Sequence, residues 1–202
     1  MLYAINPDTP QERLIRKVAG ILNAGGVIAY PTDTYYGIGC DLLNKNAIEK
    51  VYQLKQRSKN QPFSFICADL KNISEYAKVS NYAYKTMRRF LPGPYTFILP
   101  GSKLVPKIML TKRKTVGIRV PDHPICLLLV EALGHPIIST SATTPDGEVF
   151  RDPSLIQDYF GSRLDGIIDG GPVPGAPSSV ISLEGDEPVV IREGLGDVGP
   201  FR

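Results

Sequence analysis

The sequence contains few of the residues that build disulfides, metal centres and catalytic triads: three of its 202 residues are cysteines and two are histidines. Cys40, Cys67 and Cys126 form no C-x-x-C pair, and an odd number does not suit a secreted disulfide framework. Neither His123 nor His135 belongs to an H-E-x-x-H motif, and no G-x-S-x-G stretch occurs. We therefore expect reduced, buried thiols, no metal-ligand set on the protein and no serine-histidine triad.

Long apolar runs are also missing. No segment approaches the roughly 20 apolar residues of a membrane span, and residues 1–10 lack the basic start and apolar run of a signal peptide. The composition, 43% hydrophobic and 21% charged, is ordinary for a globular protein, and a net charge of +3 does not by itself indicate a nucleic-acid binder. We expect one cytoplasmic domain over residues 1–202, without membrane contact.

The usual glycine-rich phosphate motifs are absent or misplaced. The chain has no G-x-x-x-x-G-K-[ST] stretch. A literal G-x-G-x-x-G occurs at Gly194, Gly196 and Gly199, but Pro200 follows where the motif requires a helix to begin. We reject it as a dinucleotide-binding motif.

The first elements can be predicted from local signals. Thr9, Pro10 and Glu12 predict a helix start, because they supply a capping hydroxyl, a proline at the first helical position and a glutamate at the third. Gly25 and Gly26 predict its end. Residues 27–30 then have the apolar pattern of a buried strand that leads into a polar loop.

The rest of the chain alternates between helices and strands before it becomes mostly strand. We predict a helix near 47–55, a strand at 63–67 and a two-piece helix within 70–90, with Ser80 capping the second piece. Further predicted elements are strands at 95–99, 115–120, 136–140, 166–169, 178–183 and 189–191, and helices at 125–133 and after Pro153. This order favours a single-domain α/β fold with a twisted, mixed parallel and antiparallel sheet flanked by helices.

Polar residues gather at the predicted strand ends. Thr32, Asp33 and Thr34 follow one strand, Arg119 ends another, and residues 139–143 and Arg192 follow two more. Ligands of open α/β sheets bind in crevices at strand ends. Taken singly, these residues are typical of a turn, a capped connection or a surface ion pair. Their joint occurrence predicts a site for an anionic, nucleotide-like ligand.

Two cations strengthen this prediction. Lys55 and Arg57 lie two residues apart where a predicted helix gives way to a polar loop. Arginine binds phosphate oxygens through a bidentate fork, and lysine binds them as a point charge. Alone, such a pair is more typical of a solvated helix end. Together with the strand-end residues, it predicts an enzyme that acts on a polyanion.

Six ordered motifs carry a resemblance over nearly the whole chain. They are PTDTYYGIG at 31–39, LKQR at 54–57, LPGPYT at 91–96, GIRVP at 117–121, STSA at 139–142 and REG at 192–194. In this order they resemble the YrdC-like threonylcarbamoyl-AMP synthases. TKRKTVGIRVP at 111–121 and IREG at 191–194 are most similar to the YciO-like branch of that superfamily.

The resemblance implies a YrdC-like fold with a large basic concave cavity and a synthase activity. Such enzymes make threonylcarbamoyl-AMP and pyrophosphate from L-threonine, bicarbonate and ATP, with Mg²⁺ expected, and a separate transferase moves the threonylcarbamoyl group to adenosine 37 of tRNA. By motif, the resemblance implies that threonine is bound by Thr34, Arg119, Ser141 and a serine at Ser178 or Ser179. It likewise implies that ATP is bound by Lys55, Arg57, Thr115, Thr143 and Arg192, with Lys55 and Arg57 as the catalytic cations.

The chain departs from the synthase pattern at two positions. Thr143 stands where the synthases carry the asparagine of Ser-x-Asn, and Ser58 stands where they carry proline. The first change replaces an amide that both donates and accepts with a shorter hydroxyl. An enzyme of the same fold with a different acyl substrate is therefore an alternative.

A second alternative is a protein that binds tRNA or double-stranded RNA without catalysis. Lys112, Arg113 and Lys114 form its best support in the sequence, with Lys103 and Lys107 nearby. A solvated loop explains the same run of charges.

Overall fold

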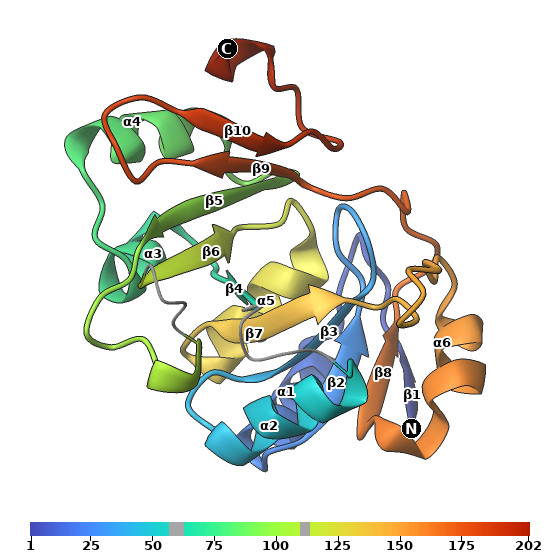
Figure 1. Cartoon of the computed structure of the whole chain (residues 1–202). Helices are drawn as coiled ribbons and strands as arrows, with labels where there is room; N and C mark the ends of the chain where they lie inside the picture. The colour runs from blue at the N-terminus through green and yellow to red at the C-terminus, as the bar shows by residue number, and fades with distance from the viewer. Residues whose placement is uncertain (57–62, 110–113) are drawn as a thin grey trace.

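The computed structural model describes residues 1–56, 63–109 and 114–202, and within them ten strands form one mixed sheet (Figure 1). The strands are β1 (Leu2–Ala4), β2 (Val27–Tyr30), β3 (Gly37–Asp41), β4 (Ser64–Ile66), β5 (Tyr95–Pro100), β6 (Thr115–Arg119), β7 (Ile137–Ser141), β8 (Gly166–Asp169), β9 (Ser179–Ser182) and β10 (Val189–Arg192). Their order across the sheet is β1-β8-β2-β3-β7-β4-β6-β5-β9-β10. Pairs β1–β8, β2–β8, β4–β6 and β5–β9 are parallel, whereas β2–β3, β3–β7, β4–β7, β5–β6 and β9–β10 are antiparallel. The predicted mixed sheet is confirmed.

Helices cover both faces of this sheet. They are α1 (Glu12–Asn23), α2 (Lys45–Leu54), α3 (Leu70–Tyr76), α4 (Asn81–Phe90), α5 (Pro124–Leu133) and α6 (Pro153–Phe160), with short 3-10 turns at Lys107–Met109, Gly161–Arg163 and Gly199–Phe201. Because successive side chains of a strand point to opposite faces, the buried strand residues divide into two clusters. The first includes Ile28, Tyr30 and Ile137 and packs against α1 and α5. The second includes Ala29 and Ile138 and packs against α2, α3, α4 and α6.

Most predicted elements are present, and two strands were missed. Neither β1 nor β3 was predicted: β1 has three residues, and β3 begins Gly37-Ile38-Gly39, a composition that is poor in strands. Pairing of β3 with both β2 and β7 outweighs that local preference. The predicted cap at Ser80 is confirmed, since its Oγ accepts from the Ala83 amide at 3.1 Å.

The predicted cap at Thr9 is wrong. Helix α1 begins at Glu12, after Gln11, and no side chain makes a capping hydrogen bond there. Instead, the Asn6 side chain accepts from the amides of Asp8 and Thr9 at 2.8 and 3.2 Å. This local turn holds Thr9 outside the helix.

The three cysteines are free and buried, as predicted. Burial raises the pKa of the Cys40 thiol to about 12, and it also raises the pKa values of Cys67 and Cys126. All three thiols are therefore protonated near neutral pH. Of the helices described, none combines the length and apolar composition that a bilayer crossing requires.

Candidate functional site

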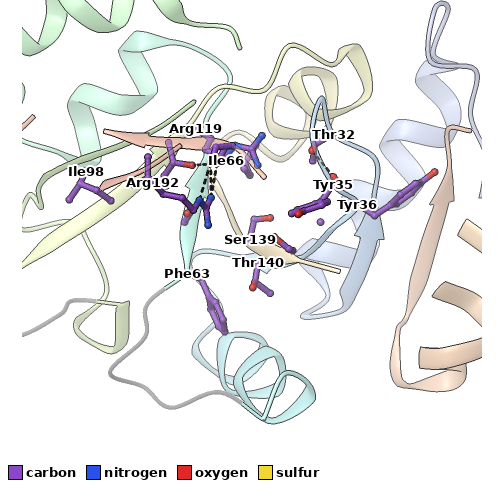
Figure 2. Close-up of a pocket in the computed structure, with 16 residues that line it drawn as sticks. Thr32, Tyr35, Tyr36, Phe63, Ile66, Ile98, Arg119, Ser139, Thr140 and Arg192 are labelled. Carbon is purple, nitrogen blue, oxygen red and sulfur yellow. Dashed lines mark hydrogen bonds between the residues drawn. The ribbon is translucent and has the colours of Figure 1, made fainter. Parts of the chain in front are cut away.

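A cavity of about 220 Å³ opens on the sheet where the predicted polar residues meet (Figure 2). Figure 2 shows Arg119 and Arg192 on one side, Thr32, Tyr35 and Tyr36 on the other, and Ser139 and Thr140 between them. The lining residues are Thr32, Tyr35, Tyr36, Gly37, Phe63, Ser64, Ile66, Thr96, Ile98, Arg119, Ser139, Thr140, Ser141, Ser178, Val180 and Arg192.

Strand pairing explains why the serine, glycine and arginine residues of this lining share one face. Ser64 of β4 lies opposite both Ser139 of β7 and Gly117 of β6, and Ile66 lies opposite Arg119. Directly paired residues point to the same face, as do residues two apart in one strand. A floor of small residues therefore lies beside the Arg119 guanidinium. The register of β5, β9 and β10 continues the face through Thr96, Val180 and Arg192.

Arg119 is held by the loop that follows β2. Its Nη2 donates to Asp33 Oδ1 and to Thr34 Oγ1, both at 2.8 Å. The Arg119 and Asp33 side chains are 13% and 10% exposed, so this ion pair is little screened by solvent. Among the described residues, the buried Nε of Arg119 has no hydrogen-bond partner. An unsatisfied buried donor is costly, so the protein itself does not use the full hydrogen-bonding capacity of this guanidinium.

The loop that holds Arg119 is itself fixed by short-range hydrogen bonds. The Thr32 hydroxyl donates to the Tyr35 carbonyl at 2.5 Å and accepts from the Thr34 amide at 3.1 Å. The amide of Asp122 donates to Asp33 Oδ2 at 3.2 Å. These bonds are typical of a turn, but their effect is to aim Asp33 and Thr34 at the arginine of the cavity.

Arg192 supplies a second guanidinium to the same face. Its Nε and Nη2 donate to the Ser178 carbonyl at 3.1 and 2.8 Å, and Ser178 Oγ lies 2.8 Å from Thr96 Oγ1. Burial and the charge of Arg119 lower the pKa of Arg192, against the opposing effect of Tyr35. Arginine remains charged even so. The alternative of a surface ion pair for Arg192 does not hold with its neighbour Glu193, because Glu193 pairs with Arg202 at 2.7 Å. Two guanidiniums on one face favour an anionic ligand.

Lys55 and Thr143 meet close to this cavity, although neither lines it. The Lys55 ammonium, at the end of α2, donates to the Thr143 carbonyl at 2.5 Å and to Thr143 Oγ1 at 2.9 Å. Thr143 follows β7, whose last residue, Ser141, lines the cavity. The contact joins residues that are 88 positions apart in the chain.

The structure brings together part of the predicted site. Arg119, Ser141, Ser178 and Arg192 line the cavity, and Thr34 contacts Arg119. Thr115 lies on β6 four residues before Arg119 and does not line the cavity.

Between the two serines left open by the sequence, Ser178 is the one that lines the cavity. The hydroxyl of Ser179 donates to the Gly196 carbonyl at 2.5 Å and accepts from the Gly194 amide at 2.9 Å. Ser179 therefore holds the segment that contains the rejected glycine motif.

Three predicted cations lie outside the described residues: Arg57, Lys112 and Arg113. Lys114 is exposed, and its carbonyl accepts from the Gly101 amide at 2.8 Å.

The prediction that residues 139–143 and Arg192 follow their strands needs correction. Ser139, Thr140 and Ser141 lie within β7, because Ser141 pairs with Gly37 of the unpredicted strand β3, and Arg192 is the last residue of β10. Ser139 belongs to the predicted run 139–143 and lines the cavity, whereas reasoning from strand ends missed Ser64 as a cavity residue. Alternation within the predicted strand at 63–67 was the signal that placed Ser64 and Ile66 on one face.

Comparison with known proteins supplies the family. The family model Sua5_yciO_yrdC, described as "Telomere recombination", matches residues 20–194. The chain belongs to the Sua5/YciO/YrdC family. Within this family, YciO of Escherichia coli (strain K12), described as an uncharacterized protein, is 46% identical over 201 residues, 98% of each chain. The crystal structure of E. coli YciO aligns with a TM-score of 0.95 over 100% of this chain and 99% of that one.

A synthase is among the family members that resemble the chain. The threonylcarbamoyl-AMP synthase of Pyrococcus abyssi is 33% identical over 186 residues, 91% of this chain and 55% of that protein. The crystal structure of P. abyssi Sua5 complexed with L-threonine aligns with a TM-score of 0.90 at 32% identity, over 96% of this chain and 57% of that one. These relatives confirm the predicted family and its single-domain mixed-sheet fold.

Proposed function

We propose that the protein is an L-threonylcarbamoyladenylate synthase, which makes threonylcarbamoyl-AMP and pyrophosphate from L-threonine, bicarbonate and ATP. The observation that carries this proposal is the cavity in which Arg119, held by Asp33 and Thr34, faces the same side of the sheet as Arg192. A family member from P. abyssi is named threonylcarbamoyl-AMP synthase, and the crystal structure of P. abyssi Sua5 contains L-threonine.

The proposed roles divide the site into two parts. Arg119 would bind the threonine carboxylate, with Thr34, Ser141 and Ser178 around the rest of the amino acid. Lys55, Arg57, Thr115, Thr143 and Arg192 would bind ATP. Ser179 is left out of the threonine site because its hydroxyl holds the backbone of Gly194 and Gly196.

The proposed reaction needs no nucleophile from the protein. The threonine amine and bicarbonate combine to a carbamate with loss of water, and a carbamate oxygen attacks the α-phosphorus of ATP. A new P–O bond forms as the bond to the leaving pyrophosphate breaks. Orientation of bound reactants can lower a barrier by roughly 7 to 11 kcal/mol in favourable intramolecular cases, so positioning is the main catalytic effect. Lysine and arginine offset the charge that develops on pyrophosphate.

Mg²⁺ fits this site as a partner of the nucleotide. In the described part of the chain, no group of three histidine, cysteine, aspartate or glutamate side chains could hold a metal ion, and Asp33 is paired with Arg119. Mg²⁺ commonly binds through substrate phosphates with few protein ligands. It would therefore bind with ATP and offset phosphate charge.

Pyrophosphate release from ATP by the purified protein tests the proposal. Turnover should require both L-threonine and bicarbonate, and omission of either should reduce it to background. The acyl-adenylate would then pass to a separate threonylcarbamoyl transferase that modifies adenosine 37 of tRNA. Nucleotide turnover without dependence on threonine would instead favour an enzyme with a different acyl substrate, the alternative motivated by the hydroxyl of Thr143 in contact with Lys55.

A further inference from the structure

A buried tyrosine reaches the cavity from two strands away. Tyr30, the last residue of β2, is fully buried, and its hydroxyl donates to Ser139 Oγ on β7 at 2.6 Å. Strand β3 lies between β2 and β7. A Cβ atom at Gly37 or Gly39 of β3 would come within 2.9 or 3.0 Å of the tyrosine ring. The two glycines therefore let the ring of Tyr30 pass over β3.

The direction of this hydrogen bond follows from burial. Burial raises the pKa of Tyr30, so its hydroxyl keeps its proton at neutral pH. That proton needs an acceptor, because an unsatisfied buried donor is costly. Among the described residues, Ser139 Oγ is the hydrogen-bond partner of the Tyr30 hydroxyl. Tyr30 is thus the donor and Ser139 the acceptor.

This direction determines what Ser139 can do in the cavity. A serine hydroxyl has one proton and two acceptor positions. One acceptor position is taken by Tyr30, and within the described part of the chain the Ser139 proton has no acceptor. Ser139 lines the cavity on the face that carries Arg119. Its proton is available to a ligand beside a buried guanidinium.

We propose that Tyr30 is a positioning residue that fixes Ser139 as a hydrogen-bond donor toward an acceptor-only oxygen of an anionic ligand. The shared chemistry is a carboxylate or phosphate oxygen. The inference rests on the proposed function, which offers two ligand groups that could supply this oxygen: the threonine carboxylate and a phosphate of ATP. It adds Tyr30 and Gly39 to the residues that define the site, and gives a role to Gly37 and Ser139, which line the cavity.

A double-mutant cycle measured by titration calorimetry tests the coupling. Tyr30→Phe and Ser139→Ala should each weaken binding of one ligand by about three- to tenfold, the range expected for a neutral hydrogen bond. Adding Tyr30→Phe to Ser139→Ala should change affinity by less than about twofold, because the donor that Tyr30 orients is already gone. The probes are L-threonine, L-threonine amide and a non-hydrolysable ATP analogue.

The probes distinguish the two sources of the oxygen. If the variants lose affinity for L-threonine, and L-threonine amide binds weakly to every variant, the oxygen that accepts from Ser139 belongs to the threonine carboxylate. Loss confined to the ATP analogue assigns a phosphate. Equal losses from Tyr30→Phe in both backgrounds would overturn the proposal, because they would mean that Tyr30 acts on the fold and not through Ser139. Tyr95→Phe is the control, since its hydroxyl donates to the Asp197 carbonyl at 3.2 Å and Tyr95 does not line the cavity.

A measurement without ligand separates this inference from the proposed function. In protein labelled with [ζ-13C]tyrosine, the Tyr30 hydroxyl proton should exchange slowly with water and lose that protection in Ser139→Ala. If neither L-threonine nor the ATP analogue binds to the wild type, the proposed function fails. The exchange rate of the Tyr30 hydroxyl proton still tests whether Tyr30 donates to Ser139. A Tyr30 proton that exchanges as fast as that of exposed Tyr84 would overturn the inference.

Discussion

The ammonium group of Lys55 donates a 2.9 Å hydrogen bond to the hydroxyl of Thr143, and thereby joins the end of α2 to the segment that follows β7. Thr143 is the position at which the resemblance to the synthases implies an asparagine. The lysine is already bonded to the shorter side chain, and it also contacts the Thr143 carbonyl, which a substitution would retain. The departure from the synthase pattern therefore has a defined partner in the structure.

Asp33→Asn should destabilise the fold by about 3 kcal/mol, because removing one partner of a buried ion pair leaves an uncompensated charge. The substitution keeps the size of the side chain, and Arg119 remains buried. Urea unfolding measures the change. Glu12→Gln is the matched control: it breaks the Glu12–Arg16 pair, whose side chains are 74% and 75% exposed, and should cost less than about 0.5 kcal/mol. Equal costs would mean that Asp33 contributes no more than a surface charge.

Arg192→Ala should weaken binding of an ATP analogue by more than about tenfold, because hydrogen bonds to charged groups contribute roughly 1.5 to 3 kcal/mol in partly buried sites. Arg202→Ala is the comparison, since the Arg202–Glu193 pair is 63% and 64% exposed. We expect less than a twofold change for it. Titration calorimetry on both variants measures the difference. If Arg202→Ala is as damaging as Arg192→Ala, the effect is one of general charge and not of the cavity.

The free energy of unfolding should fall as the pH is lowered below about 6.5, the usual pKa of histidine. The reason is that burial lowers the pKa of His123, and this effect outweighs the opposing effect of the nearby Asp33 and Asp122 charges. The unfolded chain then binds more protons than the native state, so the contribution of this residue is complete above the unfolded pKa and is lost on acidification. The buried Nδ1 of His123 has no partner among the described residues. His123→Gln should flatten the dependence of melting temperature on pH between 5 and 7, and an unaltered slope would contradict this origin.

Much of the fold follows from local patterns, and the exceptions have a common cause. Apolar runs bounded by turn residues predict most strands, and Ser80 predicts the start of α4. Strand β3 cannot be predicted in this way, because its glycines disfavour a strand locally. In the folded chain it is a strand because β2 and β7 pair with it. Local preference cannot register the pairing with β7, in which Gly37 lies opposite Ser141.

The site shows the same division between local and distant information. Motif order brings Thr34, Arg119, Ser178 and Arg192 to one place, and the contacts between them agree with that expectation. Nothing in the sequence near residue 30 indicates that its hydroxyl meets Ser139, because this contact depends on β3 lying between β2 and β7. The role of the glycines at 37 and 39 becomes visible only with that geometry.

Thr143→Asn should leave the fold unchanged and raise turnover or nucleotide affinity. The asparagine oxygen can still accept from Lys55, while its amide adds a donor one bond farther from the backbone than the threonine hydroxyl. A neutral hydrogen bond contributes about 0.5 to 1.5 kcal/mol net, so the gain should be about tenfold at most. Pyrophosphate release in the presence of threonine and bicarbonate measures it.

Thr144→Asn is the matched control for this last change, since the same substitution one residue along should give no gain. The Thr144 hydroxyl accepts from the Glu148 amide at 3.0 Å and so serves the turn rather than the site. A loss of turnover in Thr143→Asn, with wild-type melting behaviour, would mean that the hydroxyl is matched to a different ligand. That result would count against threonylcarbamoyl-AMP as the product and would favour a different acyl substrate, because the same cations would then be positioned around another group.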